Sequence, residues 1–320
     1  MSTVVSRANV ALVKYWGKRD AGLNLPEAGS ISLTLDALQT RTEVALDPKA
    51  GEDLVTIDGV VAAGRARERV VGFLDLIRPK DALRARVVSR SNFPASAGLA
   101  SSSSAFSALA VAGTSAYGVA LAPRGLSALA RRGSGSAARS IFGGFVEMYA
   151  GDDHETAHAA PLMGPGEWDL VMVLGIVGHG PKAVGSTRAM TQSRDTSPLH
   201  GGWIASVERD LPVARDAIAA QDLATLGEVM ERSCLTMHAD CMAALPGVLF
   251  WRGPTIEGFH AIRDLRSGGT PVWFTNDAGP HVKALTSAAH GARVAECLAA
   301  LPGIDEVRVS RPGPSVEFLP

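Results

Sequence analysis

Cysteine is scarce in this chain of 320 residues, which contains only Cys234, Cys241 and Cys297. An odd number of cysteines without a close CxxC pair argues against a disulfide framework and against a structural zinc site. We therefore expect the chain to work in a reducing compartment, the cytoplasm.

Long apolar runs and an excess of one charge are also missing. No run approaches the ~20 apolar residues that a membrane-spanning helix needs. The first residues lack the apolar core and the small-residue cleavage site of a secretory leader. The formal net charge is -1, which disfavours a broad surface for nucleic acid or acidic lipid. We expect no nucleic-acid partner and no membrane partner, although a local cationic pocket is compatible with this balance.

Several widespread catalytic motifs are absent as well. The chain has no GxxxxGK[ST] or GxGxxG phosphate loop, no HExxH metal motif and no GxSxG nucleophile turn. The eight histidines show no metal-ligand spacing, and residues 238–241 (His-Ala-Asp-Cys) are better explained as one turn of a helix. The sequence therefore gives no support for a common nucleotide-binding loop, for a zinc hydrolase or for a serine hydrolase.

The chain is long enough for two closely packed domains. We expect a boundary between residues 183 and 184, giving an N-terminal domain of residues 1–183 and a C-terminal domain of residues 184–320. Hydrophobic periodicity and the Gly and Pro positions predict a mixture of elements. The expected strands are 4–16, 31–35, 41–46, 83–89, 145–149, 170–176, 272–275, 307–309 and 316–318, and the expected helices are 65–77, 123–132, 137–141, 203–220, 223–245, 255–265 and 281–290.

Residues 91–120 combine a Gly/Ser-rich turn with a helix of small residues. Such a loop lets backbone N–H groups approach an anion, and the following helix adds the positive end of its dipole. The hydroxyls of Ser101, Ser102, Ser103 and Ser104 can add donors or a water-mediated metal contact. A serine-capped helix packed in a core would have the same composition, so phosphate binding and simple packing both stay open.

Three cations, Lys14, Lys18 and Arg19, fall near the end of the first expected strand. If that strand continues, Lys14, Trp16 and Lys18 share a face. A lysine beside a reaction can neutralise developing negative charge, but lysine is also common on solvated strand edges. On these residues alone, the strand edge is the better explanation.

Two later segments join hydroxyls to a single guanidinium. In residues 132–140, Ser134 and Ser136 alternate with glycine as a potential anion site, and Arg139 would share a helical face with Ser136. A planar guanidinium suits a carboxylate, although an ordinary loop with a surface arginine fits too. Thr187 and Arg188 could hold a diphosphate through charged hydrogen bonds of about 1.5–3 kcal/mol each, but a solvated loop is the simpler explanation.

Asp277 lies between an expected buried strand and an expected helix that Pro280 would open. Aspartate often caps a helix. However, Pro280 at the first helical position would make Gly279 the cap and leave Asp277 outside it. This placement favours a functional role for Asp277.

Taken in order, these segments resemble the diphosphomevalonate decarboxylase family of the GHMP small-molecule kinase superfamily. The resemblance is carried by residues 9–20 (NVALVKYWGKRD), 23–26 (LNLP), 30–35 (SISLTL), 92–102 (NFPASAGLASS), 131–140 (RRGSGSAARS), 143–147 (GGFVE) and 277–280 (DAGP), followed by Val282 and Lys283. The ordered combination spans nearly the whole chain, which makes it specific although no single segment is decisive.

The resemblance implies an α+β GHMP kinase fold, with an N-terminal half like ribosomal protein S5 domain 2 and a ferredoxin-like C-terminal half. It also implies ATP-dependent decarboxylation of mevalonate 5-diphosphate to isopentenyl diphosphate, through phosphorylation of the 3-hydroxyl and loss of phosphate and CO₂. ATP and Mg²⁺ would be required. The Mg²⁺ would be held mainly by the ATP phosphates, with Ser102 as the candidate protein contact. A homodimer would be the usual assembly.

The resemblance also implies roles for individual residues. Asp277 would orient or deprotonate the 3-hydroxyl, Lys14 would stabilise the transferring phosphoryl group, and Arg139 would hold the substrate carboxylate. The expected ATP contacts are Gly98, Ala100, Ser101, Ser102 and Ser103. The expected contacts to the substrate are Asn9, Tyr15, Lys18, Ser134, Ser136, Thr187 and Arg188.

The chain departs from the family pattern at Asn276, where an apolar residue is usual, and at His281, where asparagine is usual. Ser103 and Ser104 also replace a more alanine-like continuation of the family's phosphate loop. Residues 185–190 match only loosely. Three other functions therefore stay open: a decarboxylase that prefers mevalonate 5-phosphate, a kinase that phosphorylates the 3-hydroxyl without decarboxylation, and a non-catalytic nucleotide- or metabolite-binding protein.

Overall fold

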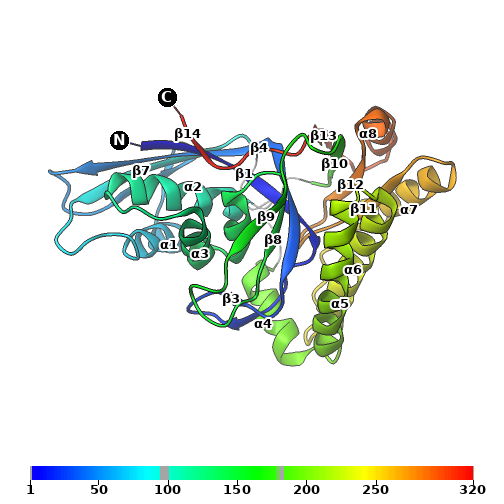
Figure 1. Ribbon diagram of the computed structural model, residues 1–320, viewed down its shortest axis with the longest axis horizontal. Helices are drawn as coiled ribbons and strands as arrows, with labels where there is room; N and C mark the ends of the chain where they lie inside the picture. The colour runs from blue at the N-terminus through cyan, green and yellow to red at the C-terminus, as the bar shows by residue number, and fades with distance from the viewer. Residues whose placement is uncertain (1, 94–100, 179, 181–183, 320) are drawn as a thin grey trace.

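The computed structural model describes residues 2–93, 101–178, 180 and 184–319. Within these residues, two β-sheets are each covered by helices, as expected for a mixed α+β chain (Figure 1). The expected ATP contacts Gly98 and Ala100 lie outside the described residues. No helix in the described part of the chain combines the length and the apolarity needed to cross a membrane.

The larger sheet is built on two long antiparallel strands, β1 and β4, and only its β5–β7 pair is parallel. The two strands expected at residues 31–35 and 41–46 are the two ends of one long strand, β4, in which the pairing with β1 shifts register between Thr34 and Gln39. A separate small hairpin joins β2 (Lys18–Asp20) to β3 (Leu25–Pro26). The larger sheet contains β1 (Ser2–Val13), β4 (Ser30–Asp47), β5 (Leu54–Ile57), β6 (Val60–Val61), β7 (Arg84–Ser91), β8 (Phe145–Met148), β9 (Ala159–Met163) and β14 (Glu317–Phe318).

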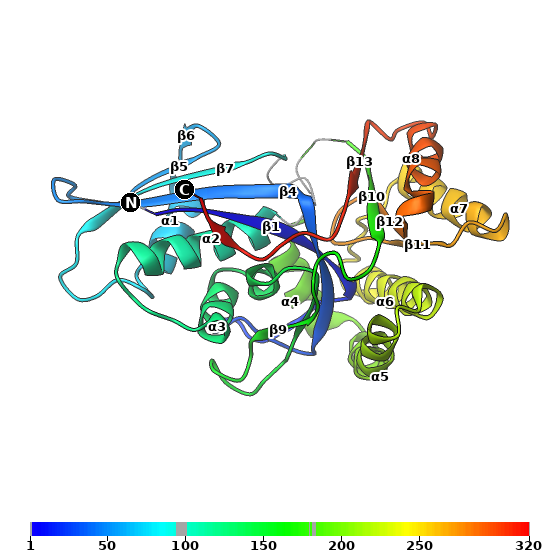
Figure 2. The same cartoon turned by 45° about the horizontal axis from the view of Figure 1, so that its top comes forward.

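Helices cover one face of the larger sheet. The central one, α2, is buried along most of its length, and its alanines and serines let it approach β1 and β4 closely (Figure 2). Pro123 opens the next helix, as its position predicts. These elements are α1 (Gly64–Leu74), α2 (Ser101–Ala116), α3 (Pro123–Gly133) and the 3₁₀ helix η1 (Gly135–Ile141).

The smaller sheet has four antiparallel strands in the order β11-β12-β10-β13. Its strand β10 precedes the expected domain boundary at residues 183 and 184, and that boundary stays a prediction. The strands are β10 (Leu170–Ile176), β11 (Val272–Thr275), β12 (Val282–Ser287) and β13 (Glu306–Ser310). The remaining elements are α4 (Ser186–Thr196), α5 (His200–Ala219), α6 (Leu223–Ala243), α7 (Gly253–Ser267), η2 (Ala288–His290) and α8 (Gly291–Ala299).

The helix expected at residues 281–290 is wrong. Most of that segment is the strand β12, which lies between β10 and β11 and hydrogen-bonds to both. Five of its six residues are buried, on both faces of the sheet. The strand therefore lacks the alternation of polar and apolar residues by which a strand is predicted from sequence. From the sequence, Pro280 is instead interpreted as the first residue of a helix.

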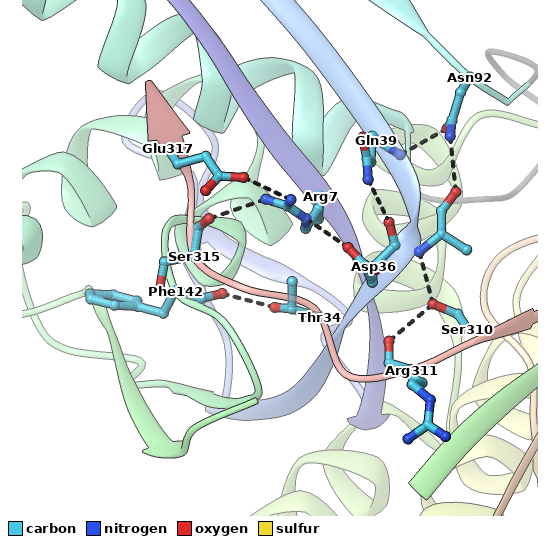
Figure 3. Close-up of polar contacts among 11 residues, drawn as sticks. Arg7, Thr34, Asp36, Gln39, Asn92, Phe142, Ser310, Arg311, Ser315 and Glu317 are labelled. Carbon is cyan, nitrogen blue, oxygen red and sulfur yellow. Dashed lines mark hydrogen bonds and ion pairs between the residues drawn. The ribbon is translucent and has the colours of Figure 1, made fainter. Parts of the chain in front are cut away.

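The end of the chain returns from the smaller sheet to the larger one, where both termini lie (Figure 2). After β13 it forms a bridge between Leu35 and Pro312, and then adds β14 to the edge of β1. Arg7 of β1 fixes this return, since its guanidinium bonds Asp36 at 3.2 Å and Glu317 at 2.8 Å (Figure 3). The returning segment thus ties the two sheets together.

Candidate active site

A carboxylate and two lysines from two distant segments of the chain meet where the two sheets adjoin. Lys14 Nζ lies 2.9 Å from Asp277 Oδ1, and Lys283 Nζ is paired with Asp277 Oδ2. Both lysine side chains are only 1% exposed, whereas that of Asp277 is 22% exposed. Asp277 is therefore the member of the cluster that a substrate can reach.

The two ammonium groups fix the charge of this carboxylate. Burial by itself would raise the pKa of Asp277, but Lys14 and Lys283 outweigh it and hold that pKa well below its usual range. Burial lowers the pKa of Lys283, and the attraction of Asp277 opposes this effect. Asp277 is accordingly ionised at neutral pH, beside an excess of positive charge.

The backbone after β1 brings Lys14 to this position. The strand expected to run to residue 16 ends at Val13, because the N–H of Lys14 donates to Ser233 Oγ of α6 at 2.9 Å instead of to a neighbouring strand. Gly17 then turns the chain with a φ of 82°. The face that Lys14 was expected to share with Lys18 along a continued strand does not form.

The turn between β11 and β12 carries Asp277 and is held by its neighbour Asn276. The Asn276 side chain accepts from Trp251 Nε1 at 3.2 Å and donates to the carbonyl of His281 at 2.6 Å. Its backbone N–H donates to Cys234 Sγ at 3.2 Å. His281 Nδ1 in turn accepts from the N–H of Val177 at 3.0 Å. Two of the departures from the family pattern, Asn276 and His281, thus lie in one hydrogen-bonded turn.

Arg139 is almost completely buried on η1, close to the same region. Its guanidinium donates to Ser30 Oγ and to Asn9 Oδ1, the latter at 3.2 Å, and lies over the Tyr15 ring at 5.8 Å from the ring centre. Burial lowers the pKa of Arg139 to about 10, while Tyr15 and Asp277 favour its charged form. Arg139 Nε and Tyr15 Oη are buried and have no hydrogen-bond partner among the residues that the structure describes. Such atoms suit a bound polar group.

The expected phosphate-binding hydroxyls form a connected row. Ser102 Oγ at the start of α2 lies 3.1 Å from Ser134 Oγ, which lies 3.3 Å from Ser136 Oγ. Ser101 and Ser102 are partly exposed, but Ser103 has no exposed surface. The side chain of Asn9 donates to the Ser136 carbonyl at 3.0 Å, so it links this row to Arg139.

Lys18 is held near the same serines by Asn24, a residue that the sequence analysis did not assign to the site. Lys18 Nζ donates to Asn24 Oδ1 at 2.6 Å. The amide of Asn24 donates in turn to the carbonyls of Arg131 and Arg132, at 3.1 and 2.7 Å, at the end of α3. Burial lowers the pKa of Lys18, and Arg69 lowers it further.

Thr187 and Arg188 lie in the first turn of α4 with exposed side chains. Within the described ranges, no hydrogen bond or ion pair links either side chain to Lys14, Asp277 or Arg139. The helix nevertheless contacts the Lys18 strand, because Arg194 donates to the Lys18 carbonyl at 2.9 Å. The roles of Thr187 and Arg188 stay predictions.

Lys283 is the main residue to which the sequence analysis gave no role in the site, although it belongs to the residues that carry the family resemblance. The sequence did contain a signal for it, because Lys283 is the one charged residue in the otherwise apolar or hydroxyl-bearing segment VKALTS. A buried lysine requires a partner, and Asp277 supplies it. The mistaken helix at residues 281–290 hid this relationship.

A cavity of about 200 Å³ opens beside the start of α2. Ser101, Ser102 and Arg69 contribute polar groups to it, and its other walls are largely apolar. Such a cavity fits a planar base joined to phosphates at a helix N-terminus. Within the described residues, no group of three or more His, Cys, Asp or Glu side chains could hold a metal ion. How the expected Mg²⁺ is bound stays a prediction.

Family models match both halves of the chain. A diphosphomevalonate decarboxylase-like N-terminal domain matches residues 6–159, and a mevalonate 5-diphosphate decarboxylase C-terminal domain matches residues 171–309. Together the two matches include all the residues of the lysine–aspartate cluster.

Individual proteins show the same similarity. The chain is 33% identical over 305 residues to the diphosphomevalonate decarboxylase of Aspergillus fumigatus, which covers 88% of this chain and 75% of that one. It is 32% identical over 291 residues to the phosphomevalonate decarboxylase of Haloferax volcanii, covering 90% and 89%. A solved structure described as MDDEF in complex with MVAPP, AMPPCP and magnesium has a TM-score of 0.93 and 36% identity, covering 99% and 98%.

Proposed function

The chain belongs to the diphosphomevalonate decarboxylase family, and we propose that it converts mevalonate 5-diphosphate to isopentenyl diphosphate with ATP. The fold is accordingly the expected GHMP kinase fold. The observation that carries the proposal is the ionised Asp277 between Lys14 and Lys283, with the buried guanidinium of Arg139 nearby. This arrangement suits a substrate with a hydroxyl to orient and a carboxylate to hold.

The chemistry begins with a poor leaving group. The 3-hydroxyl of the substrate is tertiary and cannot leave as hydroxide, so ATP first phosphorylates it. Loss of phosphate then builds positive charge at C3, while the carboxylate departs as CO₂ and leaves an alkene. Mg²⁺, when bound with the nucleotide, neutralises phosphate charge.

Asp277 accepts a hydrogen bond from the 3-hydroxyl of the substrate. This bond directs the hydroxyl oxygen toward the γ-phosphorus of ATP. Each of its oxygens still has acceptor capacity beside its lysine partner. Lys14 lies next to that hydroxyl and stabilises the negative charge of the transferring phosphoryl group. The 2.9 Å contact between Lys14 and Asp277 holds the ammonium group and the carboxylate side by side.

Arg139 holds the substrate carboxylate with the donors that Ser30 and Asn9 leave unused. Its Nε has no partner within the described residues, and Tyr15 Oη lies in the same buried region. Holding the carboxylate in a fixed direction aligns the breaking C–C bond with the departing phosphate. Arginine provides a planar fork for this task, and lysine does not.

The nucleotide and the 5-diphosphate occupy opposite ends of the serine row. Ser101 and Ser102 border the apolar cavity and bind the ATP phosphates at the start of α2. Ser134, Ser136 and Lys18 lie on the other side and bind the 5-diphosphate. Thr187 and Arg188 complete that end from α4.

The similar Haloferax volcanii protein makes mevalonate 5-phosphate a second candidate substrate. A coupled assay with mevalonate, its 5-phosphate and its 5-diphosphate, following both ADP and CO₂, distinguishes the alternatives. We expect equal amounts of ADP and CO₂, and the highest kcat/KM with the 5-diphosphate. A higher kcat/KM with the 5-phosphate would show that mevalonate 5-phosphate is the preferred substrate. Release of ADP without CO₂ would show that the protein is a kinase and not a decarboxylase.

The assembly and the location follow from the same proposal. We expect a homodimer in the cytoplasm. Light scattering of the purified protein tests the first expectation, and localisation of the tagged protein tests the second.

A further inference from the structure

We propose that Lys283 is a positioning residue, which holds Asp277 through its second carboxylate oxygen so that Asp277 orients the 3-hydroxyl as a fixed anion. The inference rests on the proposed function and deepens it. Lys14 alone would leave the carboxylate free to rotate about its single ion pair. With Lys283 at Oδ2 and Lys14 at Oδ1, both oxygens have a fixed direction.

The place of Lys283 in the fold makes it a rigid support. It lies in β12, where it is paired with Thr275 of β11 on one side and with Leu174 of β10 on the other. Its side chain is 1% exposed, and within the described residues it forms an ion pair with Asp277. A site held by central strands is positioned more accurately than one held by loops.

The charge balance argues that this lysine serves the reaction rather than the fold. Asp277 is already paired with Lys14, so a second buried ammonium leaves the cluster with a surplus positive charge. Removing one member of a buried ion pair is costly when it leaves the other charge uncompensated, but Asp277 keeps Lys14 as its partner when residue 283 is apolar. A strand that needed only stability would therefore be served by an apolar residue at 283.

The surplus charge suits a substrate that brings a carboxylate and a phosphoryl group. It also makes Asp277 a weak base before the reaction. When the hydroxyl oxygen bonds to the γ-phosphorus, the bond from phosphorus to ADP breaks and ADP keeps the electron pair. The proton of that oxygen then becomes acidic enough to pass to Asp277, and from there to solvent.

The other titratable side chains of α6 that face Asp277 carry no charge at neutral pH. Burial lowers the pKa of His238 to about 3 and raises that of Cys234, so both stay neutral. The charged and titratable groups around the carboxylate are Lys14 after β1, Lys283 on β12, Arg139 on η1, and Cys234 and His238 on α6.

The test compares Lys283→Met, Lys283→Gln and Lys283→Arg with the native enzyme and with Lys80→Met, which removes an exposed lysine. We measure kcat and KM at about pH 7, together with Tm. Met and Gln should lower kcat about 10- to 100-fold with little change in KM, because a misdirected carboxylate slows the reaction without weakening substrate binding. Arg should restore part of kcat, and Lys80→Met should match the native enzyme.

Stability separates positioning from a structural role. The Tm of Lys283→Met should equal or exceed that of the native enzyme. The inference is overturned if Met and Gln keep the native kcat, or if kcat falls only in proportion to lost folded protein. If Met does not fold, a native kcat in Gln overturns it equally. A native enzyme that releases no CO₂ would instead end the proposed function itself.

Discussion

Lys14 Nζ lies 2.9 Å from Asp277 Oδ1, although 263 positions separate the two residues in the chain. Lys14 follows the first strand of the larger sheet, and Asp277 follows a strand of the smaller sheet. The ion pair therefore exists only when the two sheets are joined. Several measurable consequences follow from this one contact and from the groups around it.

Replacing Asp277 by asparagine should nearly abolish turnover. The amide keeps the size of the side chain but removes the anion that Lys14 and Lys283 hold. We expect kcat to fall by about 10²- to 10⁴-fold, the range of a positioned proton-transfer group. ATP binding should persist, because Ser101 and Ser102 border a separate cavity. Near-normal release of ADP and CO₂ by this variant would remove Asp277 from the mechanism.

Replacing Arg139 by lysine should also be costly. Lysine keeps one positive charge but cannot donate to Ser30, Asn9 and a substrate carboxylate at once. Charged hydrogen bonds contribute about 1.5–3 kcal/mol, which corresponds to a loss of about 10- to 100-fold in kcat/KM. An unchanged kcat/KM would exclude the carboxylate role of Arg139.

Asn276 should matter for both stability and turnover, although it does not touch the substrate. In Asn276→Leu, Trp251 Nε1 and the carbonyl of His281 lose their partners, at about 1–3 kcal/mol for each unsatisfied group. Urea unfolding should show this loss. Because the same turn carries Asp277, kcat should fall in the fraction that remains folded. A leucine variant with native stability would show that the turn does not depend on this amide.

The buried His238 should make stability depend on pH. Burial and, to a smaller extent, Lys14 lower its pKa to about 3, so the folded protein binds no proton there at pH 5. The unfolded chain binds one below about pH 6.5. Unfolding therefore becomes easier as the pH falls, by about 2 kcal/mol between about pH 6.5 and about pH 5.

His238→Phe isolates this contribution, because it keeps a ring against Trp251, whose ring centre lies 4.7 Å away. The free energy of unfolding of the variant should change less between about pH 6.5 and about pH 5 than that of the native protein. Parallel pH profiles for the two proteins would contradict a neutral His238 in the folded state.

Much of the site could be predicted because its members lie in short, recognisable segments. Lys14, Arg139 and Asp277 each lie in a segment that pairs charge with glycine, serine or a strand end. Residue chemistry alone favoured a strand edge for Lys14, left Arg139 with two explanations and favoured a functional role only for Asp277. Only their ordered resemblance to one family suggested that they meet, because contacts between residues so far apart depend on the complete fold.

Other features could not be read from the sequence for identifiable reasons. Lys283 was missed because β12 is buried on both faces and shows no alternation. Asn276 was noticed as a departure, but its partners Trp251 and Cys234 come from other segments of the chain. Asn24 supports Lys18 from a turn with a φ of 52°, a conformation that asparagine tolerates but that no periodicity reveals.

A crystal structure with mevalonate 5-diphosphate and a non-hydrolysable ATP analogue tests the central claim most directly. We predict that the 3-hydroxyl lies about 3 Å from an oxygen of Asp277, with the substrate carboxylate on Arg139 and the γ-phosphate facing Lys14. A substrate bound with its hydroxyl away from Asp277, or with its carboxylate away from Arg139, would contradict the account.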